Sequence, residues 1–192
     1  MRPLKSALIA EGASDVAFLL PLLQAQLERI GWERDFEAGP IRRAAVTTVM
    51  SADRVAAEAA ELLQASDLLF VHHDDRESAK IDRLRERLEV EGRVVGVVPV
   101  RETEAWVLAA ACGLVSAVDL FEAVVPEKGH KWVEKLADPK AELGRRYRGP
   151  VAVEDLFTLI AEQADLDRLA EVPAYQSFLQ ELTAALKELN FL

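Results

Sequence analysis

Ionisable side chains crowd together directly after an apolar run in the middle of this sequence. Residues Leu68 to His72 form the run, and the next five positions are His73, Asp74, Asp75, Arg76 and Glu77. Neighbouring carboxylates repel one another unless a cation lies between them, and Mg²⁺ or Mn²⁺ is their usual partner in proteins. The pattern therefore favours a metal site. These residues alone leave open a simpler interpretation, a polar loop leading into a helix whose N-terminal dipole favours Asp and Glu.

Two further apolar runs also end in acidic residues. The run over residues 4–10 is followed by Glu11, with Asp15 one helical turn later. The run over residues 94–100 is followed by Arg101, Glu102 and Glu104. The carboxyl ends of parallel strands meet at one edge of a sheet, where open α/β sheets bind their ligands. We therefore predict that acids from all three places share one metal site.

The elements that would position these acids alternate along the first half of the chain. Apolar, β-compatible runs predict strands over residues 4–10, 44–50, 67–73 and 94–100. Apolar residues at helical spacing predict three intervening helices. The first covers residues 15–30 and is expected to end at Gly31, the second begins at a cap residue, Ser51, and the third covers residues 81–92. This order predicts an α/β fold with a four-stranded parallel sheet, right-handed crossovers and helices on both faces.

After Arg101 the pattern is helical only. We expect helices over residues 102–111, 116–122, 131–137, 139–146, 153–163 and 173–189. The division that follows is an α/β core over residues 1–112 and a helical extension over residues 113–192, packed on one side of the core within one compact domain. Trp106 is expected in the core.

Composition limits the class of protein. The chain has 192 residues, of which 51% are hydrophobic and 29% charged, as in ordinary globular domains. The single cysteine, Cys112, lies in an apolar run and is expected to be a buried thiol. We expect no transmembrane segment and no signal peptide, because the first apolar run breaks at Glu11 and Gly12. A cytoplasmic location and no membrane partner are therefore predicted.

The net charge of −10 argues against broad, non-specific affinity for nucleic acids, although a local basic surface remains compatible with it. Basic residues that could form such a surface occur in the helical extension, at Lys128, Lys131, Lys140, Arg145, Arg146 and Arg148. Arg76 is a stronger candidate for a phosphate contact, because it lies beside the carboxylates.

Three segments of the sequence resemble the Toprim domain, which occurs in topoisomerases, primases, small ribonucleases and nucleases of the OLD family. The run HDDRES, His73 to Ser78, is similar to the Asp-x-Asp-Arg-Glu-Gly run of type IA topoisomerases, with Asp75 at the second aspartate and His73 at the first. EGASD, Glu11 to Asp15, resembles the acidic spacing of OLD-type Toprim domains. PVRETEAWVLA, together with the later DPK and the stretch Pro173 to Phe178, is similar to a bacterial Toprim-like family of uncharacterised function.

The resemblance covers residues 4 to about 112 as a fold, and it implies roles for the acidic residues. Glu11 would be a general acid or base in phosphodiester transfer. Asp75 and its neighbour Asp74 would hold Mg²⁺, with Glu104 and Glu102 completing the ligand shell or binding a second ion. His73 and Asp15 are further candidate ligands. A histidine in place of the first aspartate removes one charge and shifts the preference towards Mn²⁺. A register that pairs His72 with Asp74 stays open.

Two functions are compatible with this pattern. The first is a metal-dependent, nuclease-like phosphodiester enzyme of bacterial defence or repair type, acting on nucleic acid. The second is a non-catalytic Toprim-like module that binds a metal, a nucleotide or a protein partner, which could be a second copy of the chain. The acids at Glu11, Asp75 and Glu104 favour the first, and the net charge together with the missing first aspartate favours the second.

Overall fold

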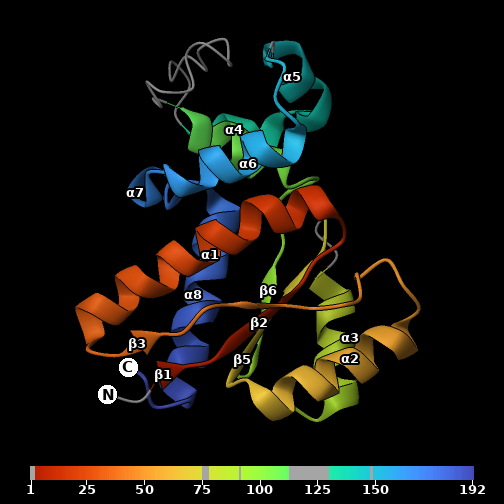
Figure 1. Ribbon diagram of the computed structural model, residues 1–192, viewed down its shortest axis with the longest axis vertical. Helices are drawn as coiled ribbons and strands as arrows, with labels where there is room; N and C mark the ends of the chain where they lie inside the picture. Colours follow the sequence, from red (N-terminus) through yellow and green to blue (C-terminus); the bar gives the residue numbers. More distant parts are fainter. Residues whose placement is uncertain (1–2, 75–77, 91, 113–129, 148) are drawn as a thin grey trace.

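The computed structural model describes residues 3–74, 78–90, 92–112, 130–147 and 149–192 of the chain. Its main sheet has four parallel strands in the order β4-β2-β5-β6, as Figure 1 shows. The strands are β2 (Ser6–Ile9), β4 (Arg42–Arg43), β5 (Leu68–His72) and β6 (Val94–Val97). A second, two-stranded parallel sheet pairs β1 (Pro3–Leu4) with β3 (Glu37–Ala38). The predicted α/β class and parallel pairing are therefore confirmed.

Helices cover both faces of the main sheet. The connecting helices are α1 (Ala13–Arg34), α2 (Ala52–Ala65) and α3 (Ser78–Leu88). In β5, Leu68 and Phe70 pack into the core on the α1 side, whereas Leu69 and Val71 pack against α2 and α3. This alternation follows from the two-residue repeat of a strand, and it explains why β5 is apolar at every position between its ends.

The second predicted strand was misplaced. Residues 44–50 form turns, and the strand in this part of the chain is β4, the pair Arg42 and Arg43 just before them. Both arginines are exposed, and β4 lies at the edge of the sheet. A short, charged edge strand has no buried face, so hydrophobic patterning does not reveal it.

The first helix is longer than predicted and does not end at Gly31. It continues to Arg34, and Asp35 closes it in the left-handed conformation, with φ of 62°. Gly31 instead allows the chain to turn back closely over the helix: the Phe36 N–H donates to the Gly31 carbonyl oxygen (3.1 Å). A Cβ at position 31 would lie 2.6 Å from the Phe36 oxygen, so only glycine fits there.

The elements described after β6 are helices. They are α4 (Glu104–Ala111), the 3-10 helix η3 (His130–Lys135), α5 (Pro139–Arg146), α6 (Val153–Glu162), α7 (Leu166–Leu169) and α8 (Pro173–Glu188). α5 and α8 have nearly the predicted bounds, whereas α7 was not predicted. The helix predicted over residues 116–122 lies outside the described residues.

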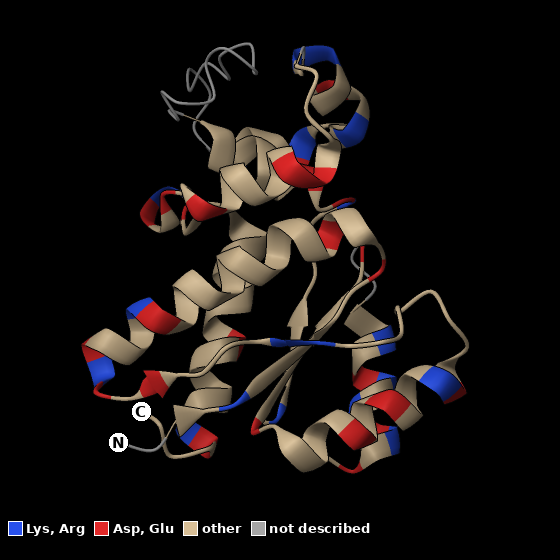
Figure 2. Ribbon diagram, viewed as in Figure 1, with Lys and Arg blue, Asp and Glu red and all other residues tan. Residues whose placement is uncertain are grey.

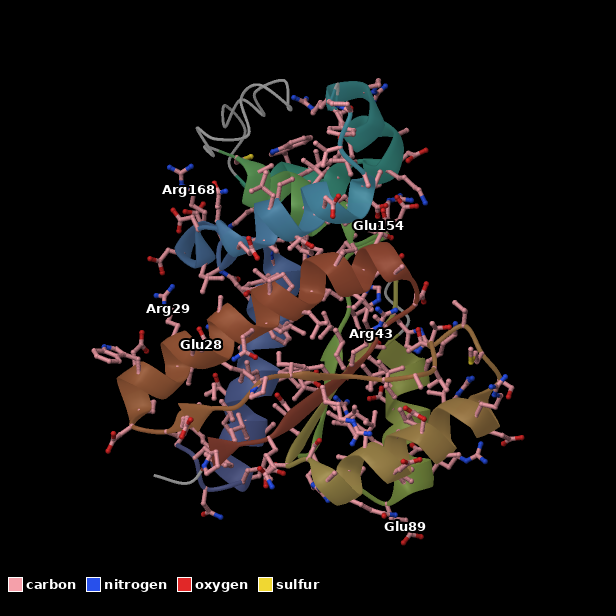
Figure 3. All side chains as sticks on the ribbon, viewed as in Figure 1. Glu28, Arg29, Arg43, Glu89, Glu154 and Arg168 are labelled. Carbon is pink, nitrogen blue, oxygen red and sulfur yellow. The ribbon has the colours of Figure 1, made fainter. Side chains whose placement is uncertain are left out.

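The helical segment packs closely against the first half of the chain. α6 lies along α1 in Figure 1, where the Thr158 hydroxyl donates to the Ala17 carbonyl oxygen (3.1 Å). Arg29 of α1 donates to Asp167 of α7 (2.6 Å), on the side of the molecule that carries the Arg29 and Arg168 labels in Figure 3. Side chains from before residue 112 and after residue 130 therefore share one core.

Trp106 of α4 is at the centre of that core, as predicted. Its side chain is fully buried, and its ring lies edge-on to Tyr175 of α8 with 5.0 Å between the ring centroids. Phe178 is the third ring of the cluster. Cys112 is buried too, and burial raises the pKa of its thiol to about 11. No helix in the described part of the chain combines the length and the apolar character that crossing a bilayer requires.

Candidate metal centre

The order of the strands places a topological switch point between β2 and β5. The chain passes from β2 outward to β4, and then returns across β2 to place β5 on its other side. Connections on the two sides of β2 therefore leave towards opposite faces: α1 packs on one face, and Ile81 and Leu84 of α3 on the other. Ligands of open α/β sheets bind at such a switch point, beyond the carboxyl ends of the strands. Glu11 follows β2 and Asp74 follows β5 at this point.

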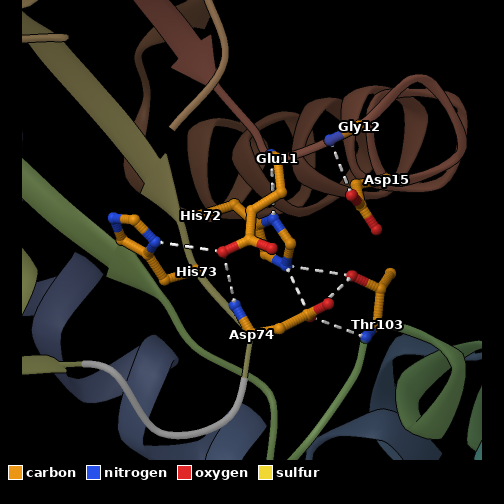
Figure 4. A network of polar contacts seen from close by, with 7 residues as sticks. All are labelled: Glu11, Gly12, Asp15, His72, His73, Asp74 and Thr103. Carbon is orange, nitrogen blue, oxygen red and sulfur yellow. Dashed lines mark hydrogen bonds and ion pairs between the residues drawn. The ribbon is translucent and has the colours of Figure 1, made fainter. Parts of the chain in front are cut away.

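His72, Asp74 and Thr103 form a compact network there (Figure 4). The Thr103 N–H donates to Asp74 Oδ1 (3.0 Å), and the Thr103 hydroxyl lies 2.9 Å from His72 Nε2. His72 Nε2 is also 3.2 Å from Asp74 Oδ1. His72 and Thr103 are fully buried, whereas the Asp74 side chain is 27% exposed. One oxygen of Asp74 is thus fixed by the protein, while the carboxylate still reaches solvent.

Asp15 enters the same site from the first turn of α1. Its Oδ2 accepts the Gly12 N–H (2.8 Å), which caps the helix and fixes the carboxylate. Burial raises the pKa of Asp15 above its ordinary value; His72 and the Thr103 hydroxyl lower it, and Asp74 raises it further. A buried carboxylate beside a second one is stabilised by a cation, because the cation offsets both the burial and the repulsion.

Asp15, His72 and Asp74 together could hold a metal ion, because one potential ligand atom from each lies within 4.8 Å of the others. The two carboxylates suit Mg²⁺ or Mn²⁺, and an imidazole nitrogen would favour the softer Mn²⁺. The sequence pattern had put Asp15 and Asp74 among the candidate ligands. His72 belonged only to the register that was left open.

The hydrogen bonds around His72 favour a supporting role over direct ligation. The Glu11 N–H points at His72 Nδ1 (3.4 Å), and a backbone N–H needs an acceptor, so Nδ1 accepts this bond and the ring carries its proton on Nε2. With its proton on Nε2, the ring donates a hydrogen bond to either the Asp74 carboxylate or the Thr103 hydroxyl. An ion bound at Nε2 would displace this proton and lose the Glu11 contact. Asp15 and Asp74 therefore fit a cation better than His72 does.

Glu11 lies between the network and His73. Its Oε1 accepts the Asp74 N–H (3.3 Å) and lies 3.1 Å from His73 Nδ1. His73 therefore faces Glu11 and lies outside the cluster of Asp15, His72 and Asp74, although the sequence suggested it as a ligand. Burial lowers the pKa of His73, and the nearby Glu11 carboxylate partly offsets this by raising it. The ring is therefore neutral and donates from Nδ1 to the Glu11 carboxylate.

Glu102 and Glu104, the predicted acids after β6, take different positions. Glu104 is buried at the start of α4; burial raises the pKa of its carboxyl, and the negative charges of Glu102 and Asp15 raise it further. Glu102 accepts the Lys140 N–H (3.1 Å) and so supports the start of α5. Neither is within the three-residue cluster. Arg101, just before them, has a φ of 73°, a strained conformation for a residue with a side chain.

Two predicted site residues, Asp75 and Arg76, lie outside the described residues. Thr103 was missed by the sequence reasoning. Thr103 lies between two glutamates at the start of a predicted helix, and this position predicts a helix cap and not a residue of the site. In the structure its hydroxyl makes no capping bond and contacts His72 instead.

The predicted basic surface on the helical segment is only partly described, because Lys128 and Arg148 lie outside the described residues. Arg145 and Arg146 of α5 both pair with Glu142, which offsets part of their charge. Figure 2 shows these cations at one end of the molecule, far from α2.

Comparison with known proteins finds no matching family model, no matching curated protein and no matching solved structure. The Toprim resemblance therefore stays a prediction.

Proposed function

We propose that this chain is a metal-dependent phosphodiester-processing protein, nuclease-like in its chemistry, with Mg²⁺ or Mn²⁺ held by Asp15 and Asp74. The observation that supports it best is the position of Glu11. This carboxylate is hydrogen-bonded to the backbone of Asp74 (3.3 Å), directly beside the cluster that could hold the ion, and its side chain is 22% exposed. A group that can exchange protons with solvent thus lies next to two fixed carboxylates.

Each residue then has a defined task. Asp15 and Asp74 bind the ion, and Thr103 with His72 keeps Asp74 in place. A divalent ion in such a site stabilises the charge that builds on phosphate oxygens and lowers the pKa of water. Glu11 takes a proton from the attacking water or returns one to the leaving oxygen. His73 orients Glu11 from the other side by donating to Oε1.

Glu11→Gln tests this assignment. The amide keeps the shape of the side chain, and its oxygen can still accept the Asp74 N–H, but it cannot exchange a proton at neutral pH. Cleavage of nucleic acid should fall by roughly 10²- to 10⁴-fold, while Mn²⁺ binding stays close to that of the wild type. Single- and double-stranded DNA and RNA are the substrates to assay. Glu33→Gln is a matched control, because Glu33 is an exposed residue of α1 whose partner is Arg29. Equal rates for Glu11→Gln and the wild type would remove Glu11 from the mechanism.

A second candidate is a non-catalytic module that binds a metal, a nucleotide or a partner protein. One observation favours it: within the described part of the chain the cluster holds only two carboxylates, and both already accept backbone N–H groups. In that case the wild type and Glu11→Gln are both inert on every substrate, although both bind Mn²⁺.

A further inference from the structure

A cavity of about 490 Å³ opens beside the metal centre, on the α2 and α3 side of the sheet. His73 forms part of its wall, and the same ring lies 3.1 Å from Glu11. A ligand in the cavity would therefore be separated from the proposed general acid or base by one side chain. The volume is within the range of sites that bind small molecules.

The charged part of the lining is positive. Lys80, Arg83 and Arg87 line the cavity, and their spacing places them along one side of α3. No carboxylate is found among the described lining residues, although the chain as a whole carries a net charge of −10. Arg87 pairs with Asp53 at the rim (2.6 Å), whereas Arg83 makes no ion pair with any described residue. The described charged residues of the lining are thus cationic, on a protein whose net charge is −10.

Most of the other lining residues are apolar. Val49 and Met50 contribute from the turn after β4, and Val55 and Leu84 from α2 and α3. Val49 is 70% exposed, so its apolar side chain is open to contact with a ligand. A ligand that fits both parts has an anionic group and a flat or apolar body.

We propose that this cavity binds a nucleoside phosphate, with the phosphate against Lys80 and Arg83 and the base over Val49 and Met50. This inference rests on the proposed function for its connection to catalysis, but the binding itself does not require the metal. The same chemistry is offered by a free nucleotide and by one unit of a nucleic-acid strand. A strand in this position would lead its next phosphate past His73 towards Glu11 and Asp74.

Binding can be measured apart from cleavage. A fluorescent six-nucleotide oligothymidylate and a fluorescent thymidine monophosphate are titrated with the protein in EDTA, over a series of salt concentrations. The test variant is Lys80→Glu with Arg83→Glu. The control is Arg34→Glu with Lys187→Glu, which makes the same change in net charge on helix ends outside the cavity. Thermal melts of both variants show whether they are folded.

The cavity variant should bind the oligonucleotide roughly tenfold more weakly than the wild type. The slope of log affinity against log salt should also become shallower by about 0.7, because the variant loses the one phosphate contact that Lys80 and Arg83 share, and each such contact on a single strand contributes about 0.7. The control should keep the wild-type slope. If the wild type binds thymidine monophosphate about as tightly as the oligothymidylate, the ligand is a free nucleotide. If it binds only the oligothymidylate, the ligand is a nucleic-acid strand.

Two results would overturn the inference: no binding of either probe by the wild type at low salt, or equal weakening by the cavity variant and the control. Failure of the proposed function looks different. If the probes bind as expected but Mn²⁺ produces no cleavage, the cavity remains and the nuclease assignment fails. If the cavity variant cleaves with the wild-type KM, the nuclease assignment remains and the cavity is not the substrate site.

Discussion

The hydroxyl of Thr103 lies 2.9 Å from Nε2 of His72, in the buried interior between the end of β5 and the start of α4. The backbone N–H of the same threonine donates to Asp74 (3.0 Å). Thr103 therefore connects the loop after β6 to the end of β5, and it fixes the orientation of the Asp74 carboxylate. This contact makes the loop after β6 part of the candidate metal centre, although neither Glu102 nor Glu104 belongs to the cluster.

Replacing Thr103 by valine should separate the two contacts. Valine keeps the shape and the backbone N–H but removes the hydroxyl, so His72 Nε2 retains only Asp74. We expect the free energy of unfolding to fall by about 1 kcal/mol and Mn²⁺ affinity to fall with it. Denaturant unfolding and calorimetric titration measure the two effects. Thr103→Ser, which keeps the hydroxyl, is the control, and equal behaviour of the serine and valine variants would show that the hydroxyl contact is unimportant.

The raised pKa of Asp15 predicts a pH-dependent cost in stability when no metal is bound. A raised pKa means that the folded state holds the proton more tightly than the unfolded chain does. Stability is therefore lost as pH rises from the unfolded pKa through the folded one, and no cost exists at lower pH, where the carboxyl is protonated in both states.

Asp15→Asn should accordingly be more stable than the wild type at pH 7 in EDTA and equally stable at pH 3. The asparagine oxygen can still accept the Gly12 N–H, so the helix cap is kept. Saturating Mn²⁺ should reverse the order at pH 7, since only the aspartate binds the ion well. Thermal unfolding at the two pH values checks this. A stability difference that is constant with pH would mean that burial does not perturb Asp15.

The metal preference distinguishes a ligand from a supporting residue at His72. Asp74→Asn should lower the affinity for Mn²⁺ and for Mg²⁺ by more than roughly tenfold, because it removes a charged ligand. His72→Gln should lower the affinities for Mn²⁺ and Mg²⁺ by the same factor as each other, so that their ratio is unchanged. The reason is that Nε2 of His72 donates to Asp74 and does not bind the ion. A marked shift of the ratio towards Mg²⁺ in His72→Gln would instead identify a direct Mn²⁺ ligand.

Much of the fold could be predicted because its signals are local. β5 and β6 are uninterrupted apolar runs, and α5 has its cap at Asp138, whose carboxylate accepts the Ala141 N–H, followed by Pro139. The meeting of Asp15 with Asp74 is also predictable, because parallel strands bring their carboxyl ends to one edge. By contrast, β4 could not be found, since exposed Arg42 and Arg43 at a sheet edge have no apolar pattern.

The identity of the histidine at the site could not be predicted for a related reason. Successive side chains on a strand point to opposite faces, so His72 and His73 face different surroundings. Polar alternation normally reveals which residue faces which side, but β5 is buried on both faces and carries no alternation. The result is that His72 faces Asp74 and Thr103, and His73 faces Glu11 and the cavity.

β6 is the edge strand of the main sheet on the side opposite β4. Two of its outward backbone groups are hydrogen-bonded to side chains. Arg85 of α3 donates from two nitrogens to the Val94 carbonyl oxygen (2.8 and 3.1 Å), and Glu181 of α8 accepts the Gly96 N–H (2.5 Å). Arg85 and Glu181 also pair with each other. Two side chains thus satisfy the groups through which another strand could add to the sheet.

Glu181→Ala should open that edge. The Gly96 N–H loses its acceptor and Arg85 keeps, among the described residues, only Asp82 as a carboxylate partner, so we expect a fall of about 1–3 kcal/mol in the free energy of unfolding. We also expect a concentration-dependent shift towards dimers or larger species, because an unpaired edge can bind a second copy. Size-exclusion chromatography over a hundredfold range of protein concentration measures the shift. Gln180→Ala is the control, since Gln180 is the exposed neighbour on the same helix. If both variants elute as the wild type does at every concentration, the Arg85–Glu181 pair contributes to stability alone and does not protect the edge.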